Sequence, residues 1–218
     1  TQWGAYTGSI GWNPLDKNPW GTHFNLDDPD FQKTIAWYFG LVEKGYMPSC
    51  EIFGKRSGSY QQVAQGKAVL GMNGSWMIST FASIPGIDLQ IVPTPVGPRG
   101  HRASPFNGLA DSVTKFADDK AAAGKWVAYL GSSECQMKVA DAGVVLPARS
   151  EAMERSIQVR EDAGFDVGPF ALHVKDGTTQ DPAVTVNAAD VAALTSPGFE
   201  AVFIGQKDVT YLSELNHQ

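Results

Sequence analysis

The residues best suited to bind a ligand lie together between residues 65 and 81, in the stretch QGKAVLGMNGSWMISTF. The apolar run at residues 68–72 has the length of a buried strand and is too short for a helix. Asn73, Gly74 and Ser75 then favour a turn and a helix cap, and the apolar spacing from Trp76 onward predicts a short amphipathic helix. Ligands of open α/β sheets bind at the carboxyl ends of the strands, so Trp76 is placed where its ring can lie against a flat apolar ligand face.

A second group of aromatic residues lies at the start of the chain, where Trp3, Trp12 and Trp20 occur among glycine, asparagine and proline. Residues 1–26 are loop-like, and two interpretations are open. In one, the terminus packs its aromatic side chains on the nearest face of the core. In the other, the loop lies at the mouth of a cleft, where Trp3 and Trp12 contact the C–H faces of pyranose rings.

The composition argues against several other functions. The 218-residue chain has 43% hydrophobic and 18% charged residues, which is typical of a globular protein. Its net charge of −6 argues against nucleic-acid binding, because phosphate contacts need a basic surface. The four histidines form no metal-ligand pattern, and we expect no cofactor. Cys50 and Cys135 are compatible with one disulfide or with two separate thiols.

The elements that must position these residues are short helices and strands. Asp28 and Pro29 predict the start of a helix that stops at Gly45. A short helix at residues 59–65 precedes the central run, and two further strands are expected, at residues 88–92 and at the start of residues 106–113. The remaining expected elements are an irregular stretch at 164–181 and helices at 118–130, 132–141, from 150, at 184–194, 198–204 and 208–215.

Several of these segments resemble the extracellular solute-binding proteins of the maltose-binding type, the receptors of ABC-type sugar importers. The central stretch is similar to a GK-x-A-M-x-x-x-G-x-W pattern of that family, with Val-Leu in place of Ala-Met, at Gly66, Lys67, Gly74 and Trp76. Three further stretches resemble family segments: LDDPDFQKTIAWYFGLVEKGYMP, KAAAGKWVAYLGSSECQMKVADAGVVLPARSEA and FEAVFIGQKDVTYLSELN. The resemblance covers the chain from about residue 26 to its end.

The resemblance implies roles for the residues of the central turn. The Trp of the family pattern stacks on the sugar ring, which assigns that role to Trp76. Asn73 and Ser75 would form the turn or bind sugar hydroxyls.

Two further places are implied more loosely. Asn107 and Gly108 would form a polar edge of the site, although Leu109 stands where the family often has an aromatic residue. An ordinary turn beside a buried strand is the alternative. The guanidinium of Arg149 would meet a hydroxyl or carboxylate in the cleft, or would form a surface ion pair.

The resemblance also implies the fold class: α/β, periplasmic-binding-protein-like, of type II and like the maltose-binding proteins. Because family members are considerably longer, we expect an incomplete fold, mostly the helix-rich C-terminal lobe with a mixed sheet. Residues 1–104 would carry the aromatic loop and the stacking residue in that lobe. Residues 105–146 would return to the N-terminal lobe, and residues 147–218 would close the C-terminal lobe with helices.

The function implied is that of a non-catalytic subunit that binds a mono- or oligosaccharide and delivers it to the membrane permease of an ABC importer. The location would be extracytoplasmic, in the periplasm or lipid-anchored at the cell surface. A fragment would keep one wall of the cleft and would dimerise or exchange strands through its uncovered surface. A receptor for a polyol or peptide is the alternative. A glycan-active enzyme is less favoured, because Asp88, Asp111 and Asp141 lack a diagnostic spacing.

Overall fold

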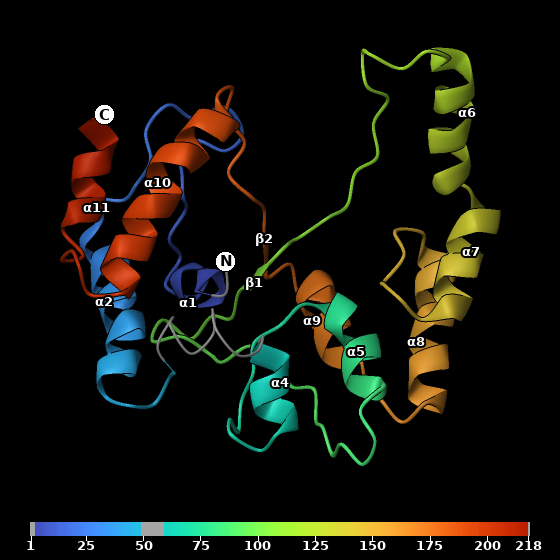
Figure 1. The fold of residues 1–218 in the computed structure, drawn as a ribbon, viewed down its shortest axis with the longest axis horizontal. Coiled ribbons are helices and arrows are strands. Elements are labelled where there is room, and N and C mark those ends of the chain that lie inside the picture. The colour runs from blue at the N-terminus through green and yellow to red at the C-terminus, as the bar shows by residue number, and fades with distance from the viewer. Residues whose placement is uncertain (1–2, 49–58, 218) are drawn as a thin grey trace. The chain divides into compact units, whose positions relative to one another are not determined.

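The protein is described by a computed structural model that covers residues 3–48 and 59–217 (Figure 1). Cys50 lies outside these residues, so its pairing with Cys135 stays open. The α-helices are α1 (Gly4–Ser9), α2 (Pro29–Glu43), α4 (Ser59–Ala64), α5 (Ile78–Ala82), α6 (Lys120–Leu130), α7 (Ser133–Ala142), α8 (Ser150–Asp162), α9 (Gly168–Lys175), α10 (Ala188–Phe203) and α11 (Tyr211–Glu214). Two 3-10 helices, η1 (Ser75–Met77) and η2 (Leu215–His217), and two short strands, β1 (Ser104–Pro105) and β2 (Thr179–Gln180), complete the described elements.

The chain divides into two compact units, each assembled from segments that are distant in sequence. The first unit comprises Thr1–Gln61, Thr94–Asn107 and Asp176–Gln218, and the second comprises Gln62–Pro93 and Gly108–Lys175. These units cut across the expected division at residues 104 and 146. The assignment of segments to lobes therefore stays a prediction.

Helix α2 shows why local sequence sets helix ends in this chain. The carboxylate of Asp28 accepts a hydrogen bond from the N–H of Phe31 at 2.8 Å, and Pro29 occupies the first helical position, where no N–H is needed. Gly45 follows the helix with φ +71°, a conformation that favours glycine. Both predicted ends of this helix are confirmed.

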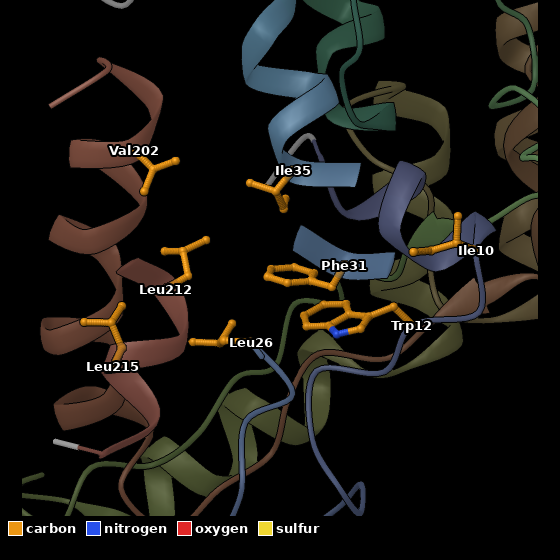
Figure 2. Packing of buried hydrophobic residues seen from close by; sticks show 8 residues of the cluster. All are labelled: Ile10, Trp12, Leu26, Phe31, Ile35, Val202, Leu212 and Leu215. Atoms are coloured by element: carbon orange, nitrogen blue, oxygen red, sulfur yellow. The ribbon is translucent and has the colours of Figure 1, made fainter. Parts of the chain in front are cut away.

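The core of the first unit packs α2 against α10 and α11 (Figure 2). Phe31 and Ile35 of α2 are fully buried, and the ring of Phe31 stacks on that of Trp12 with centroids 4.2 Å apart. The other buried members of this cluster are Ile10, Leu26, Val202, Leu212 and Leu215. An apolar core of this kind supplies most of the favourable free energy of folding.

The sheet of the first unit is a parallel pair in which Ser104 lies opposite Thr179 and Pro105 opposite Gln180. A single antiparallel bridge joins Leu15 to Phe24. The described residues therefore form a helix-rich fold with a small parallel sheet, rather than a larger mixed sheet.

The strands predicted at residues 68–72, 88–92 and 106–113 are wrong, because these segments lack regular structure apart from isolated bends. Val69 and Leu70 are 96% and 83% exposed, so the apolar run is not buried. A strand exists only where a neighbour completes its hydrogen bonds. Among the described residues, 68–72 and 88–92 join no strand pair, and at 106–113 only the N–H of Phe106 bonds to a strand, at the carbonyl of Gln180.

The second unit is built around the adjacent helices α7 and α8. The hydroxyl of Ser132 accepts a hydrogen bond from the N–H of Cys135 at 3.2 Å, and Gly143 follows α7 with φ +61°, which confirms both predicted ends. The helix predicted at residues 118–130 is found as α6, and its Trp126 side chain is 60% exposed.

Two predictions about the C-terminal third are wrong. Helix α9 and strand β2 lie in the stretch expected to be irregular. The two helices predicted around residues 184–204 form the single helix α10, which continues through Pro197. Proline lacks the N–H that a helix interior needs, yet α10 passes through Pro197 without a break.

Candidate functional site

Trp76 is the second residue of η1, the 3-10 turn that leads directly into α5. The N–H of Met77 donates to the carbonyl of Gly74 at 3.0 Å and closes this turn. The Trp76 side chain is 47% exposed, so part of the indole is in contact with solvent. The expected turn and short helix are confirmed, although no strand precedes them.

The indole ring of Trp76 lies against the main chain at Gly74. A Cβ placed on Gly74 would lie 2.2 Å from both Cζ3 and Cη2 of Trp76, far inside van der Waals contact. The backbone at Gly74 is extended, with φ −87° and ψ 166°, so a side chain here would be compatible with the backbone but would make the Trp76 ring move. The ring therefore rests against the main chain on one side.

Asn73 and Ser75 lie in the same turn, half-buried on either side of Gly74. The turn is held from its C-terminal side by Ile78 and Phe81, the two buried residues of α5. The structure thus brings an aromatic ring, an amide and a hydroxyl together within four consecutive residues.

Trp3 and Trp12 belong to the core of the first unit. Trp12 is 8% exposed and its Nε1 donates to the carbonyl of Asn25 at 2.8 Å. Trp3 stacks on Phe199 with ring centroids 5.0 Å apart and an interplanar angle of 19°. These contacts favour the interpretation in which the loop packs its aromatic rings on the core, and a sugar contact by either ring stays a prediction.

Asn107 and Gly108 stand where the chain passes from the first unit to the second. The preceding residue, Phe106, donates its N–H to the carbonyl of Gln180 at 2.8 Å. This hydrogen bond lies directly after the paired residues of β1 and β2. Both residues are exposed, and the backbone after them is irregular.

Arg149 precedes α8 and lines an open hollow of about 530 Å³ together with Ser133, Ala148, Ser150 and Glu151. Its Nε donates to the carbonyl of Gly131 at 2.8 Å, so this contact is with the main chain and not with a carboxylate. Arg149 and the Trp76 turn belong to the second unit, whereas Trp3 and Trp12 belong to the first.

Two acidic residues of the second unit lie in exposed ion pairs. Asp141 forms an exposed ion pair with Arg155 at 2.7 Å. A hydrogen bond from Lys138 lowers the pKa of Glu134, which also belongs to an exposed pair. Over residues 3–48 and 59–217, no group of three or more His, Cys, Asp or Glu side chains is arranged to hold a metal ion.

The sequence profile of the bacterial extracellular solute-binding proteins matches residues 2–167 of this chain. The chain belongs to this family. The matched range includes the Trp76 turn, Asn107, Gly108 and Arg149 of this solute-binding protein. Its described helices include none with the length and apolar character needed to cross a bilayer.

Solved structures of solute-binding proteins share the fold. UspC of M. tuberculosis has a TM-score of 0.74 at 23% identity, over 99% of this chain and 53% of that one. An ABC substrate-binding protein from Listeria monocytogenes, in complex with cycloalternan, has a TM-score of 0.78 at 15% identity, over 97% and 54%. A cyclic alpha-maltosyl-1,6-maltose binding protein from Arthrobacter globiformis has a TM-score of 0.66 at 16% identity, over 99% and 53%.

These neighbours confirm the periplasmic-binding-protein-like fold of this solute-binding protein. The chain spans about half the length of each of them. A search among curated proteins gave no match.

Proposed function

We propose that this solute-binding protein is a non-catalytic carbohydrate receptor in which Trp76 stacks on a pyranose ring. The observation that carries the proposal is the half-exposed indole held against Gly74, which leaves part of an aromatic surface open to solvent. Large exposed aromatic rings on a rigid turn suit the C–H faces of sugars, because burying both surfaces removes apolar area from water.

The neighbouring polar side chains complete this assignment. The Asn73 amide and the Ser75 hydroxyl flank the seat of the ring, and both can donate to and accept from sugar hydroxyls. A ligand with alternating C–H faces and hydroxyl edges matches such a turn better than a purely apolar or purely charged ligand does. The names of two structural neighbours support the choice of a sugar, since both refer to cyclic oligosaccharides.

The proposal is tested by titrating the protein with cycloalternan, cyclic maltosyl-maltose and maltose, followed by tryptophan fluorescence and calorimetry. Trp76→Ala should weaken binding of the responding sugar at least about tenfold, which corresponds to about 1.4 kcal/mol. Trp126→Ala is the matched control, because Trp126 is an exposed tryptophan of the same unit.

Two results would overturn the carbohydrate assignment. One is the absence of binding to all three sugars together with binding of sorbitol or trialanine, which stand for a polyol and a peptide ligand. The other is a sugar affinity that Trp76→Ala leaves unchanged. A loss of affinity in Trp126→Ala alone would move the site to α6.

We also propose that binding is not followed by chemistry and that the sugar is passed to the permease of an ABC importer outside the cytoplasm. Membership of the extracellular solute-binding family supports this location and this partner. The sugar should be recovered intact after prolonged incubation with the protein. Cleavage products that disappear in Asp111→Asn would contradict a receptor role.

A second partner proposal concerns copies of this chain. Val69, Leu70 and Leu109 expose more than four-fifths of their surface, in segments without regular secondary structure. Such segments pair readily with strands of another molecule. Light scattering after gel filtration should show a dimer that Leu70→Lys converts to a monomer, and a monomer at all concentrations would refute it.

A further inference from the structure

We infer that Ser79 and Arg160 are positioning residues for Trp76, because both bind the carbonyl of Gly143 and thereby fix the helix that follows the Trp76 turn. The predicted effect on sugar affinity rests on the proposed function. Its structural content, the orientation of the indole, can be measured without a sugar. All residues involved belong to the second unit.

The carbonyl of Gly143 is the point where three helices meet. Gly143 follows the C-terminus of α7, with φ +61°. Its carbonyl accepts a hydrogen bond from Oγ of Ser79 in α5 at 2.6 Å and another from Nη2 of Arg160 in α8 at 2.9 Å. A carbonyl oxygen has two lone pairs, so these two donors satisfy it completely.

Arg160 is the more strongly held of the two donors. Its side chain is buried, and Nη1 donates to the hydroxyl of Ser156 one turn earlier in α8. Burial lowers the pKa of the Arg160 guanidinium, but an arginine stays protonated at neutral pH. Its described hydrogen-bond partners are neutral oxygens, and Nε has no partner among the described residues.

This buried charge is stabilised by the end of α7. The last carbonyls of a helix carry partial negative charge, and a cation at that end is favoured. Moving the guanidinium away from Gly143 would leave a buried charge with fewer acceptors, which is unfavourable. Arg160 therefore fixes the position of the Gly143 carbonyl, which also accepts the hydrogen bond from the Ser79 hydroxyl of α5.

Ser79 connects the Gly143 carbonyl to the helix that follows the Trp76 turn. Ser79 is the second residue of α5 and lies three positions after Trp76, so its hydroxyl is anchored about one turn beyond the indole. A helix of five residues is not stable by itself. Without the hydroxyl, Ile78 and Phe81 would hold α5 through apolar contacts, which are less directional than a hydrogen bond.

The indole is thus constrained from both ends of η1. Gly74 supplies the surface against which the ring rests, and the Ser79–Gly143 hydrogen bond fixes the position of α5, which follows the turn. A shift of α5 would rotate the ring off Gly74 and change its exposure. The orientation of the stacking face is then a property of α7 and α8 as well as of the turn.

The first experiment measures acrylamide quenching of the Trp76 fluorescence, obtained as the difference between each variant and the same variant carrying Trp76→Phe. Ser79→Ala should raise the quenching constant about twofold. It should also weaken sugar binding about fivefold, as expected for the loss of one hydrogen bond. Ser79→Thr keeps the hydroxyl and should restore both values.

Ser83→Ala is the matched control. Ser83 lies one turn later, and its hydroxyl donates to the carbonyl of Thr80 within the same helical turn at 2.7 Å. Its loss should change neither the quenching of Trp76 nor the sugar affinity. Equal quenching constants in Ser79→Ala and the parent would overturn the inference. So would a loss in Ser83→Ala as large as that in Ser79→Ala.

Arg160 is tested by Arg160→Lys and Arg160→Met, measured at a temperature where circular dichroism shows each variant folded. Arg160→Met should raise Trp76 quenching as Ser79→Ala does, and Arg160→Lys should restore part of it. A role confined to stability would lower the unfolding midpoint without moving the quenching constant, and this would overturn the inference. If the parent binds no sugar, the proposed function fails, while the quenching values still decide whether the indole is positioned in this way.

Discussion

The two units of this chain bury different kinds of side chain. The first unit has an aromatic and aliphatic cluster in which Phe31 and Ile35 are completely buried and Phe31 stacks on Trp12 (Figure 2). The largest completely buried side chains of the second unit are only Val167 and Ser156, and it also buries the guanidinium of Arg160. Dispersion and the hydrophobic effect contribute most of the stability of the first unit, whereas hydrogen bonds at helix ends contribute a larger share of the stability of the second.

This difference bears on where a ligand turn can be placed. Apolar packing is strong but tolerates small displacements, whereas hydrogen bonds depend steeply on distance and angle. The Trp76 turn belongs to the second unit, where the bonds of Ser79 and Arg160 to Gly143 fix its helix. A stacking ring needs a defined orientation more than it needs a large core beneath it.

The largest expected effect is the loss of stability on replacing Phe31. Phe31→Ala removes a fully buried ring and should lower the free energy of unfolding by about 3–5 kcal/mol. Urea unfolding followed by circular dichroism measures it. Ile78→Ala in the second unit is the comparison and should cost about 2 kcal/mol, since Ile78 is smaller and packs in a smaller core. An equal or larger cost at Ile78 would break the contrast between the units.

Helix caps should behave alike in both units, because a cap is a local contact. Asp28→Ala in α2 and Ser132→Ala in α7 each remove one side-chain acceptor of a backbone N–H, and each should cost about 1 kcal/mol. Asp28→Asn and Ser132→Thr keep an acceptor and should restore most of the stability. A cost at only one of the two caps would show that tertiary packing, and not the cap, fixes that helix end.

The sequence predicted the features that depend on neighbouring residues. Asp28 and Gly45 mark the ends of α2 through local contacts and backbone conformation, and the structure has those ends. Asn73, Gly74 and Ser75 likewise predicted the turn before Trp76, and the structure has that turn. These signals need no knowledge of the rest of the fold.

Features that depend on distant residues were not predictable in this way. The apolar runs at residues 68–72 and 88–92 have strand composition, but a strand requires a partner from elsewhere. Arg160 is an ordinary helix residue in sequence. Its importance arises from burial beside Gly143, 17 positions earlier. The turn that carries Trp76 could be predicted from sequence, but the distant contacts that support it could not.

Acid should remove the stabilising contribution of one carboxylate in each unit, Asp16 in the first and Glu134 in the second. The Asp16 carboxylate accepts from the N–H of His23 at 3.2 Å and of Thr22 at 3.0 Å, and the His23 bond is the main cause of its lowered pKa. The pKa of Glu134 in the second unit is lowered by Lys138. Because both pKa values are lower in the folded protein, these bonds stabilise it fully above about pH 4 and are lost as the pH falls through the folded values.

The test compares urea midpoints between neutral pH and pH 2.5 for the parent, Asp16→Asn and Glu134→Gln. Each variant should lose a small part of the acid dependence, since both carboxylates are exposed and screened by solvent. A decrease in stability with rising pH between about 2.5 and 4 would contradict a lowered pKa at these two carboxylates.

The smallest effect on stability is expected at an apolar residue that the fold leaves in solvent. Val69 is 96% exposed, so Val69→Ser removes almost no buried surface and should leave the unfolding midpoint unchanged. Val202, a buried valine of the first unit, is its counterpart, and Val202→Ser should cost about 2 kcal/mol or more, because it loses buried area and leaves a hydroxyl in an apolar site. Urea titration of both variants measures the difference. If Val69→Ser destabilised the protein as Val202→Ser does, residues 68–72 would be packed in solution, and the second unit would have an apolar core comparable to that of the first.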